Sequence, residues 1–176
     1  MKTGRQTSHS ATDAPPDREN LIWVTNSTTR PGPVVNSLNA ACESGFLPDR
    51  IYLLSNPKVA GQIDPIRTRA NTIVEAYGGD EFDIHITNLE DETDFVDIVT
   101  HYRDAVETAR EADQPVAVDV TPGRKYMSAI AFQAGFRFEA DHVFYLHVES
   151  NRFYDLSYPE IPRTGIALID FTEELA

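Results

Sequence analysis

Short apolar runs alternate along this chain with longer segments in which apolar residues recur every three or four positions. The runs have the length and the β-branched and aromatic content of strands, and the longer segments have the periodicity of helices that bury one face. The predicted strands are residues 21–25, 50–55, 82–87, 115–120, 142–148 and 165–171. The first is apolar nearly throughout, which predicts a strand buried on both faces of a sheet.

Four helices are predicted between these strands. Their inward-facing positions are Val34, Leu38, Ala41 and Cys42; Ile66, Ala70, Ile73, Val74 and Tyr77; Phe95, Ile98, Val99, Tyr102, Ala105 and Ala109; and Met127, Ile130, Ala131 and Ala134. Gly45 is expected to end the first helix and the glycine pair at 78–79 the second. The third helix is expected to be capped near Asp91 or Thr93, and the fourth to span residues 125–138.

This alternation predicts an α/β fold: a Rossmann-like three-layer sandwich with a mainly parallel six-stranded sheet and helices on both faces. The connection before the last strand holds Pro159 and Pro162 but no helical period, so we expect that strand to return antiparallel beside the fifth. Residues 1–19 are almost free of apolar side chains and are expected to be a disordered tail. Residues 20–176 are expected to form a single domain that ends directly after the last strand.

The charge balance adds information about the setting. Asp and Glu number 28 against 15 Lys and Arg, a net charge of −13, and the lysines are Lys2, Lys58 and Lys125. An acidic, lysine-poor chain is typical of a halophilic organism, with an ordinary acidic protein as the alternative. In both cases the charge disfavours non-specific binding to DNA. No apolar run is long enough to span a membrane, and the single cysteine, Cys42, is expected in the core. These features predict a cytoplasmic protein.

A ligand site is predicted where the strand order reverses, between the first and fourth strands, because open parallel sheets bind ligands beyond their carboxyl ends at this point. Two polar loops meet there, and each opens a helix whose free N–H groups suit phosphate. The candidates in the first loop are Asn26, Ser27, Thr28, Thr29 and Arg30. The hydroxyls of this loop have capping and turn formation as an alternative role, and Arg30 has that of a plain surface charge.

The second loop carries the more informative sequence, Asp119-Val-Thr-Pro-Gly-Arg-Lys125. Gly123 allows close approach of the backbone to a ligand, and Thr121 offers a hydroxyl. Arg124 and Lys125 lie at a predicted helix N-terminus, where the helix dipole disfavours cations unless an anion is bound. This arrangement favours an anion-binding turn.

Other common sites are disfavoured. No Gly-x-Gly-x-x-Gly follows the first strand and no Walker A motif is present, so neither a dinucleotide cofactor nor a P-loop nucleotide is expected. The histidines lack the spacing of metal ligands, so we predict neither a metal nor a cofactor. Four aromatic residues offer base stacking, with core packing as the alternative: Tyr145, Phe153, Tyr154 and Tyr158.

The segment Asp119-Val-Thr121-Pro-Gly123-Arg-Lys125-Tyr-Met127 resembles the signature of the CARF family, the Rossmann-like sensor domains of CRISPR systems, in which Asp-x-Thr-Gly-Gly-Thr-Lys-x-Met is common. The polar loop after the first strand is similar to the family's second ligand loop. Pro122 and Arg124 depart from the pattern, and Pro122 removes one backbone donor.

The resemblance implies a homodimer that binds a cyclic oligoadenylate, with cyclic tetra-adenylate favoured. Lys125 and Thr121 would contact phosphate and ribose, with Ser27 to Thr29 from the other loop, while Asp119 orients the turn. Gly123, Arg124 and Met127 complete the ligand-binding set that the resemblance implies.

A chain without an effector domain resembles the ring nucleases, which end type III CRISPR signalling. These enzymes cleave the ring without a metal, by attack of a ribose 2′-OH that yields a 2′,3′-cyclic phosphate. Lys125 would stabilise phosphoryl charge, and Ser27 would orient the ribose. Two alternatives stay open: a non-catalytic sensor acting on a separate partner, and an unrelated nucleotide-binding Rossmann-like domain.

Overall fold

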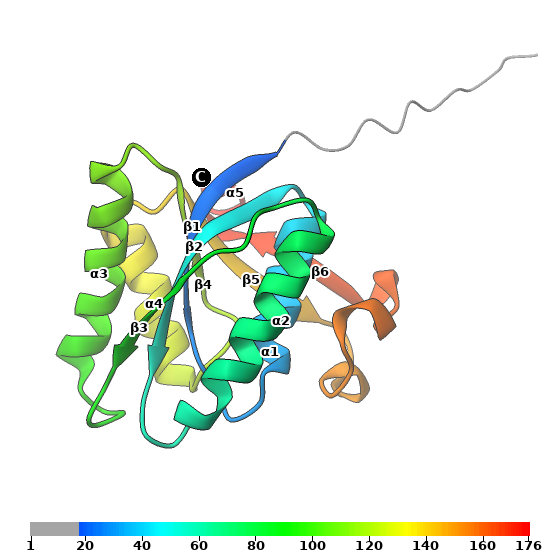
Figure 1. Ribbon diagram of the computed structural model, residues 1–176, viewed down its shortest axis with the longest axis horizontal. Coiled ribbons are helices and arrows are strands. Elements are labelled where there is room, and N and C mark those ends of the chain that lie inside the picture. The colour runs from blue at the N-terminus through cyan, green and yellow to red at the C-terminus, as the bar shows by residue number, and fades with distance from the viewer. Residues whose placement is uncertain (1–17) are drawn as a thin grey trace, which may run out of the picture.

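The computed structural model describes residues 18–176, so residues 1–17 of the tail expected at 1–19 lie outside the described residues. The sheet has the strand order β3-β2-β1-β4-β5-β6 (Figure 1). Its strands are β1 (Glu19–Asn26), β2 (Phe46–Ser55), β3 (Ile84–Asn88), β4 (Val116–Asp119), β5 (His142–Val148) and β6 (Ile166–Asp170). The pairs between β3 and β5 are parallel and β6 is antiparallel to β5, as predicted.

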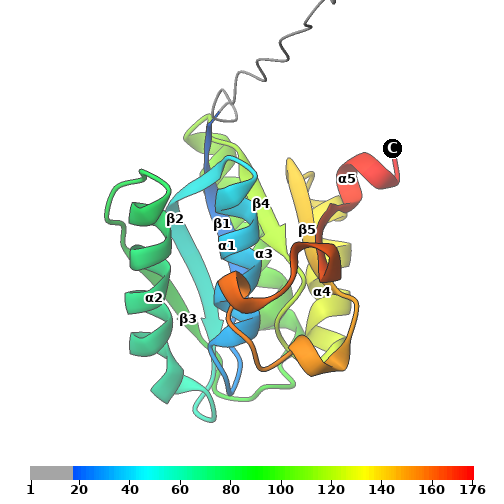
Figure 2. The same cartoon turned by 90° about the vertical axis from the view of Figure 1, so that its right-hand side faces the viewer.

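Helices cover both faces of the sheet, with α1 and α2 on one face and α3 and α4 on the other (Figures 1 and 2). Their bounds are α1 (Gly32–Glu43), α2 (Ile63–Ala76), α3 (Phe95–Glu111) and α4 (Lys125–Arg137). The predicted three-layer α/β architecture is therefore confirmed. Within residues 18–176, no helix has the length and apolar content needed to span a membrane.

The central strand β1 explains why two layers of helices are needed. Leu21 and Trp23 pack into the core under α1 and α2, whereas Ile22 and Val24 pack into the core under α3 and α4. All four side chains are fully buried. Because successive side chains of a strand point to opposite faces, an apolar run at the sheet centre requires cover on both sides.

Strand β2 begins at Phe46 instead of residue 50, and β1 includes Glu19, which was expected in the tail. Apart from such shifts at strand ends, three details of the sequence prediction were wrong. A short helix, α5 (Phe171–Glu174), follows β6, because the Asp170 carboxylate caps it by accepting from the Thr172 N–H. The cap of α3 is Asp94, which accepts from the Asp97 N–H, whereas Asp91 accepts from Thr93 in the preceding turn.

Phe95 is the third difference: it is 53% exposed instead of inward-facing. It is the first residue of α3 and lies against Tyr126 at the end of the helix layer, with ring centroids 5.6 Å apart. Helical periodicity predicts on which face of a helix a residue lies. It does not predict whether the sheet extends far enough to cover that residue.

Between β5 and β6 the chain forms three short 3-10 turns: η2 (Asn151–Phe153), η3 (Tyr158–Glu160) and η4 (Arg163–Gly165). Figure 2 shows this segment running alongside α1. It is attached through Asn36 of α1, whose side chain donates to the Leu156 carbonyl at 2.9 Å and accepts from the Tyr158 N–H at 3.0 Å. The segment thus forms one side of the molecule next to the carboxyl end of β1.

A fully buried carboxylate, Asp119, connects the elements around the reversal of strand order. Its Oδ2 accepts from the hydroxyls of Thr25 in β1 at 3.1 Å and of Ser37 in α1 at 2.6 Å, and its Oδ1 accepts from the Thr121 N–H at 2.9 Å. Burial raises the pKa of this carboxyl to about 6, although the three hydrogen bonds act in the opposite direction. The carboxylate therefore fixes β1, α1 and the turn after β4 relative to one another.

This raised pKa predicts a pH-dependent stability. Between the ordinary Asp pKa of about 3.9 and about 6, the folded protein retains a proton that the unfolded chain releases. The free energy of unfolding contributed by Asp119 therefore falls as the pH rises through this window. Relative to Asp119→Asn, which has no such proton, we expect the wild type to lose about 1.4 kcal/mol per pH unit there.

The measurement is urea unfolding at fixed ionic strength and a series of pH values, with exposed Asp83→Asn as the control. Parallel curves for the wild type and Asp119→Asn across the window would show that Asp119 does not titrate with a raised pKa.

Candidate ligand-binding site

The loops after β1 and β4 lie side by side, as predicted for the point where strand order reverses. The Asn26 side chain donates to the Pro122 carbonyl at 3.3 Å, which joins the two loops directly. Gly123 has φ +110°, and a Cβ added there would lie 3.1 Å from Asn26 Nδ2 and 3.3 Å from Met127 Cβ. Glycine is therefore needed at this position both for its backbone conformation and for the close approach.

A hollow of about 270 Å³ opens between these loops, and we call it the switch-point hollow. Six of the residues predicted from sequence line it: Ser27, Thr28, Thr29, Gly123, Arg124 and Met127. Four lining residues were not predicted: Asn56, Lys58, Val59 and Glu92. They come from the loop after β2 and from the turn before α3.

Lys58 could have been proposed from the sequence, because its loop directly follows a predicted strand, as the two candidate loops do. Glu92 gave no such signal, since it belongs to the acidic run Glu90-Asp91-Glu92 in a chain rich in carboxylates.

Glu92 is held between two cations at this hollow. Its Oε1 lies 2.8 Å from Lys58 Nζ and 3.2 Å from Arg124 Nη2. The hydrogen bond from Lys58 is the main reason that the pKa of Glu92 is lowered. Arg124 is the N-cap of α4, so an internal carboxylate supplies part of the negative charge that a cation at this helix end requires.

Ser27 differs from its polar neighbours because its hydroxyl oxygen is buried and has no hydrogen-bond partner among the described residues. The residue is 6% exposed and lines the switch-point hollow. Buried hydroxyls are nearly always paired, so an unpaired hydroxyl on a residue that lines a hollow is a candidate partner for a ligand atom.

Two other predicted residues use their polar groups inside the protein. Asn26 is 1% exposed, accepts from the Tyr102 hydroxyl at 2.8 Å and donates to Pro122. The Thr121 hydroxyl oxygen accepts from the Leu146 N–H of β5 at 2.8 Å. Neither lines the switch-point hollow, so in this structure both groups brace the loops.

Lys125 and Arg30 also lie outside the residues that line this hollow. Lys125 is exposed on the first turn of α4, and within residues 18–176 no ion pair involves its ammonium group. Arg30 forms an ion pair with Asp155 of the segment between β5 and β6. The structure therefore directs Arg30 away from the hydroxyls that precede it in the same loop.

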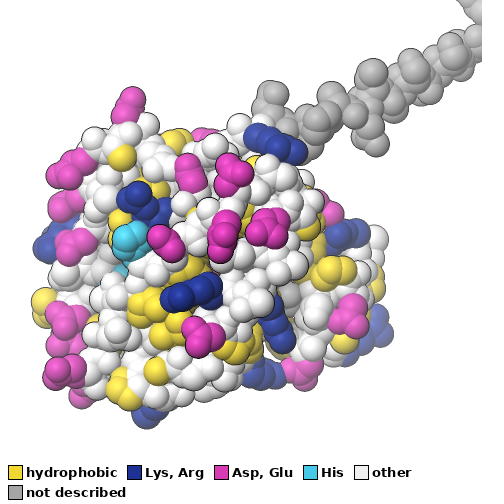
Figure 3. Space-filling model, in the orientation of Figure 1, with side chains coloured by type: hydrophobic (Ala, Val, Ile, Leu, Met, Phe, Trp, Pro, Cys, Tyr) yellow, Lys and Arg dark blue, Asp and Glu magenta, His cyan; other side chains and the backbone are white. Residues whose placement is uncertain are grey.

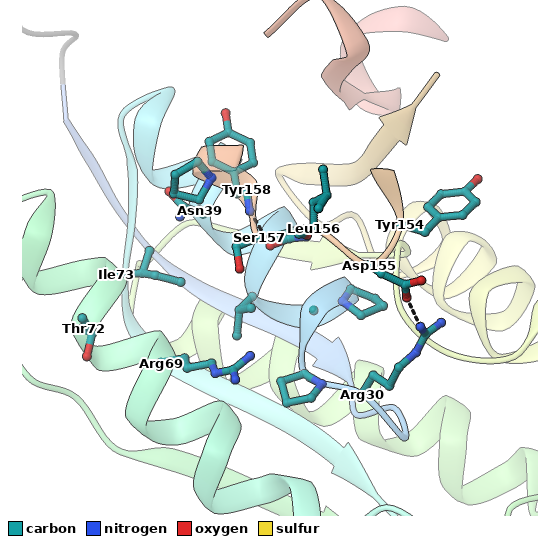
Figure 4. Close-up of a pocket in the computed structure, with 16 residues that line it drawn as sticks. Arg30, Asn39, Arg69, Thr72, Ile73, Tyr154, Asp155, Leu156, Ser157 and Tyr158 are labelled. Carbon is teal, nitrogen blue, oxygen red and sulfur yellow. Dashed lines mark hydrogen bonds and ion pairs between the residues drawn. The ribbon is translucent and has the colours of Figure 1, made fainter. Parts of the chain in front are cut away.

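Arg30 lines a second hollow, of about 460 Å³ (Figure 4). It is bounded by α1, α2 and residues 154–159, and Arg69 of α2 lies at its edge with Arg30. Of the four aromatic residues considered for base stacking, Phe153 and Tyr158 are buried, whereas Tyr154 is 52% exposed beside this hollow. Tyr145 is half-buried and lines a smaller hollow together with Thr121.

The chemistry available at the switch-point hollow is hydrogen bonding and charge. In the part of the chain that the structure describes, no group of three or more His, Cys, Asp and Glu is placed to hold a metal ion. His101 is buried elsewhere, with Nδ1 2.8 Å from the Thr87 hydroxyl, and burial lowers its pKa to about 4. It is therefore neutral and does not supply charge to the hollow.

The contrast between Ser27 and Thr121 predicts opposite effects of removing their hydroxyls. Ser27→Ala removes a buried group that has no partner in the described part of the chain, so we expect the free energy of unfolding to change by less than about 0.5 kcal/mol. Thr121→Val keeps the shape but leaves the Leu146 N–H unpaired, so we expect a loss of about 1–3 kcal/mol. Urea denaturation measures both, and a large loss for Ser27→Ala would show that its hydroxyl has a structural bond.

No protein-family model matches this sequence, and no curated protein matches it. Among solved structures, Csm6 from Enterococcus italicus bound to cyclic hexa-2′-fluoro-hexa-dAMP aligns with a TM-score of 0.56 and 13% identity, over 87% of this chain and 42% of that one. Protein VC1899 from Vibrio cholerae aligns with a TM-score of 0.53 and 12% identity, over 71% of this chain and 30% of that one. The chain thus spans less than half of each protein, and at these identities the likeness shows a shared fold.

Proposed function

We propose that this protein binds a cyclic oligoadenylate through the switch-point hollow, acting as a homodimer, with cyclic tetra-adenylate as the favoured ring. The observation that carries the proposal is the meeting of the two loops at Ser27, whose buried hydroxyl has no partner within residues 18–176, and at the cations Lys58 and Arg124. The resemblance of residues 119–127 to the CARF signature supports this choice of ligand. So does the shared fold with a Csm6 that was solved with a cyclic hexanucleotide analogue bound.

Local contacts must provide the affinity, because the protein as a whole repels anions. The net charge is −13, and Figure 3 shows Asp and Glu side chains spread over the face seen in Figure 1. In the high salt that the composition suggests, the Debye length is roughly 3 Å or less, so distant charges contribute little. Charge-assisted hydrogen bonds from Lys58, Arg124 and Lys125, together with the Ser27 hydroxyl, are short enough to act under these conditions.

The size of the hollow supports a shared site. Its volume of about 270 Å³ is at the lower limit of small-molecule sites, which are roughly 300–1,000 Å³. It suits one phosphate with part of a nucleotide, and a ring of four adenylates must extend beyond it. A ring with two-fold symmetry that lies across an isologous interface would use one such hollow in each of two copies.

We further propose that the bound ring is cleaved without a metal. The 2′-oxygen of one ribose attacks the adjacent phosphorus, its proton passes to solvent, and the bond from phosphorus to the 5′-oxygen breaks. The leaving 5′-oxygen takes up a proton, and the products are a 2′,3′-cyclic phosphate and a 5′-hydroxyl. Lys125 stabilises charge on the phosphoryl oxygens and Ser27 orients the ribose, so both groups act on the transition state.

Labelled cyclic tetra-adenylate, incubated with the protein in high salt and excess EDTA, tests both steps. We expect a linear product with a 2′,3′-cyclic phosphate, and a dimer by light scattering. Lys125→Ala should lower the cleavage rate by about 100-fold or more, the typical effect of removing one electrostatic contact to a transition state, while retaining part of the binding. Arg67→Ala, which changes an exposed cation on α2, is the matched control and should leave both unchanged.

Each alternative has its own outcome in this experiment. Stoichiometric binding with an intact ring after hours would reject cleavage and select the non-catalytic sensor. A monomer that binds no cyclic oligoadenylate would reject the proposed ligand and leave a nucleotide-binding domain of another class. Unchanged cleavage in Lys125→Ala would remove Lys125 from the mechanism.

A further inference from the structure

The Glu92 carboxylate marks a place at the switch-point hollow where two cations converge. A single oxygen, Oε1, receives both Lys58 Nζ at 2.8 Å and Arg124 Nη2 at 3.2 Å. An ammonium and a guanidinium that converge on one anionic oxygen are the donors that a non-bridging phosphate oxygen also requires. The three side chains come from three different loops, so the fold itself produces this convergence.

Stability gives little reason for this arrangement. The cationic side chains are largely exposed, 66% for Lys58 and 60% for Arg124, whereas the Glu92 side chain is 19% exposed. Ion pairs with one partner in solvent contribute little to the free energy of folding, because water solvates the exposed charge well. A competing anion could therefore take over both cations at small structural cost.

A second, independent feature points to a ligand at the same place. Ser27 lines this hollow, and its buried hydroxyl has no hydrogen-bond partner in Glu92 or any other described residue. A carboxylate has two oxygens in one plane, whereas a phosphate presents its oxygens in a tetrahedron. A phosphate oxygen held by Lys58 and Arg124 leaves further oxygens to accept from a donor on another wall of the hollow.

The attachment of Glu92 permits its side chain to leave. The Tyr126 hydroxyl donates to the Glu92 backbone carbonyl at 2.7 Å, not to the carboxylate. The neighbouring turn is held by Asp91 and Thr93, and α3 by its cap Asp94. Rotation of the Glu92 side chain into solvent therefore breaks the two ion pairs and leaves the backbone contacts intact.

We propose that Lys58 and Arg124 form a phosphate subsite and that Glu92 competes for it from within the same chain. The subsite takes one phosphate group, and the strength of the internal competitor sets the threshold at which a phosphate-bearing ligand binds. This inference deepens the proposed function and rests on it for the identity of the full ligand, but not for the subsite.

The test measures binding of two probes, inorganic phosphate and cyclic tetra-adenylate, by isothermal titration calorimetry at fixed KCl and pH. Glu92→Gln keeps the size of the side chain and removes its charge, so we expect both probes to bind roughly three- to tenfold more tightly. Lys58→Ala should weaken both by about tenfold. Glu90→Gln removes an exposed carboxylate two residues away and is the matched control, which should bind as the wild type does.

The two probes separate failure of this inference from failure of the proposed function. If Glu92→Gln binds phosphate no more tightly than Glu90→Gln, although both variants melt at the wild-type temperature, internal competition is rejected. If the phosphate affinities of the variants differ as predicted but none binds cyclic tetra-adenylate, the subsite stands and the proposed function fails. If the ring binds and all variants bind it equally, the proposed function stands and the subsite is rejected.

Discussion

The site depends on one buried interaction: the three hydrogen bonds that the Asp119 carboxylate accepts. A buried charge is tolerated only when hydrogen bonds compensate for the lost water. Here the donors come from β1, from α1 and from the turn after β4. These hydrogen bonds therefore hold the loop after β1 and the turn after β4 in fixed positions relative to each other, without a ligand. The close packing of Gly123 against Asn26 then completes the junction.

Around this junction the polar residues divide into two groups. Asn26 and Thr121 use their side chains to bind other parts of the protein, as buried polar groups must. Ser27 and Arg124 instead line the switch-point hollow; the Ser27 hydroxyl has no partner among the described residues, and Arg124 is paired with Glu92. Residues with similar sequence signals therefore differ in role. The groups with buried internal hydrogen bonds set the shape of the loops, and an unpaired hydroxyl or a cation with a replaceable partner is available to a ligand.

The charge of the protein gives the hollow a particular character. Most of the chain is acidic, so cations near the loops attract carboxylates of the same protein as well as external anions. Glu92 at Lys58 and Arg124, and Asp155 at Arg30, are examples. An anion that binds at these cations must then displace a carboxylate of the protein. Specificity for phosphate depends on its tetrahedral arrangement of oxygens, which a planar carboxylate does not have.

The sequence alone determined the sheet, the antiparallel last strand and the two loops, because these follow from the period and composition of contiguous segments. The apolar run 21–25 required a central strand, and the motif at 119–125 marked the turn after β4. Tertiary structure decided which side chains reach the hollow. Lys58 and Glu92 come from segments distant in sequence, and the exposure of Phe95 depends on where the sheet ends. Such contacts arise from packing between elements, and the periodicity of apolar residues within one element does not predict them.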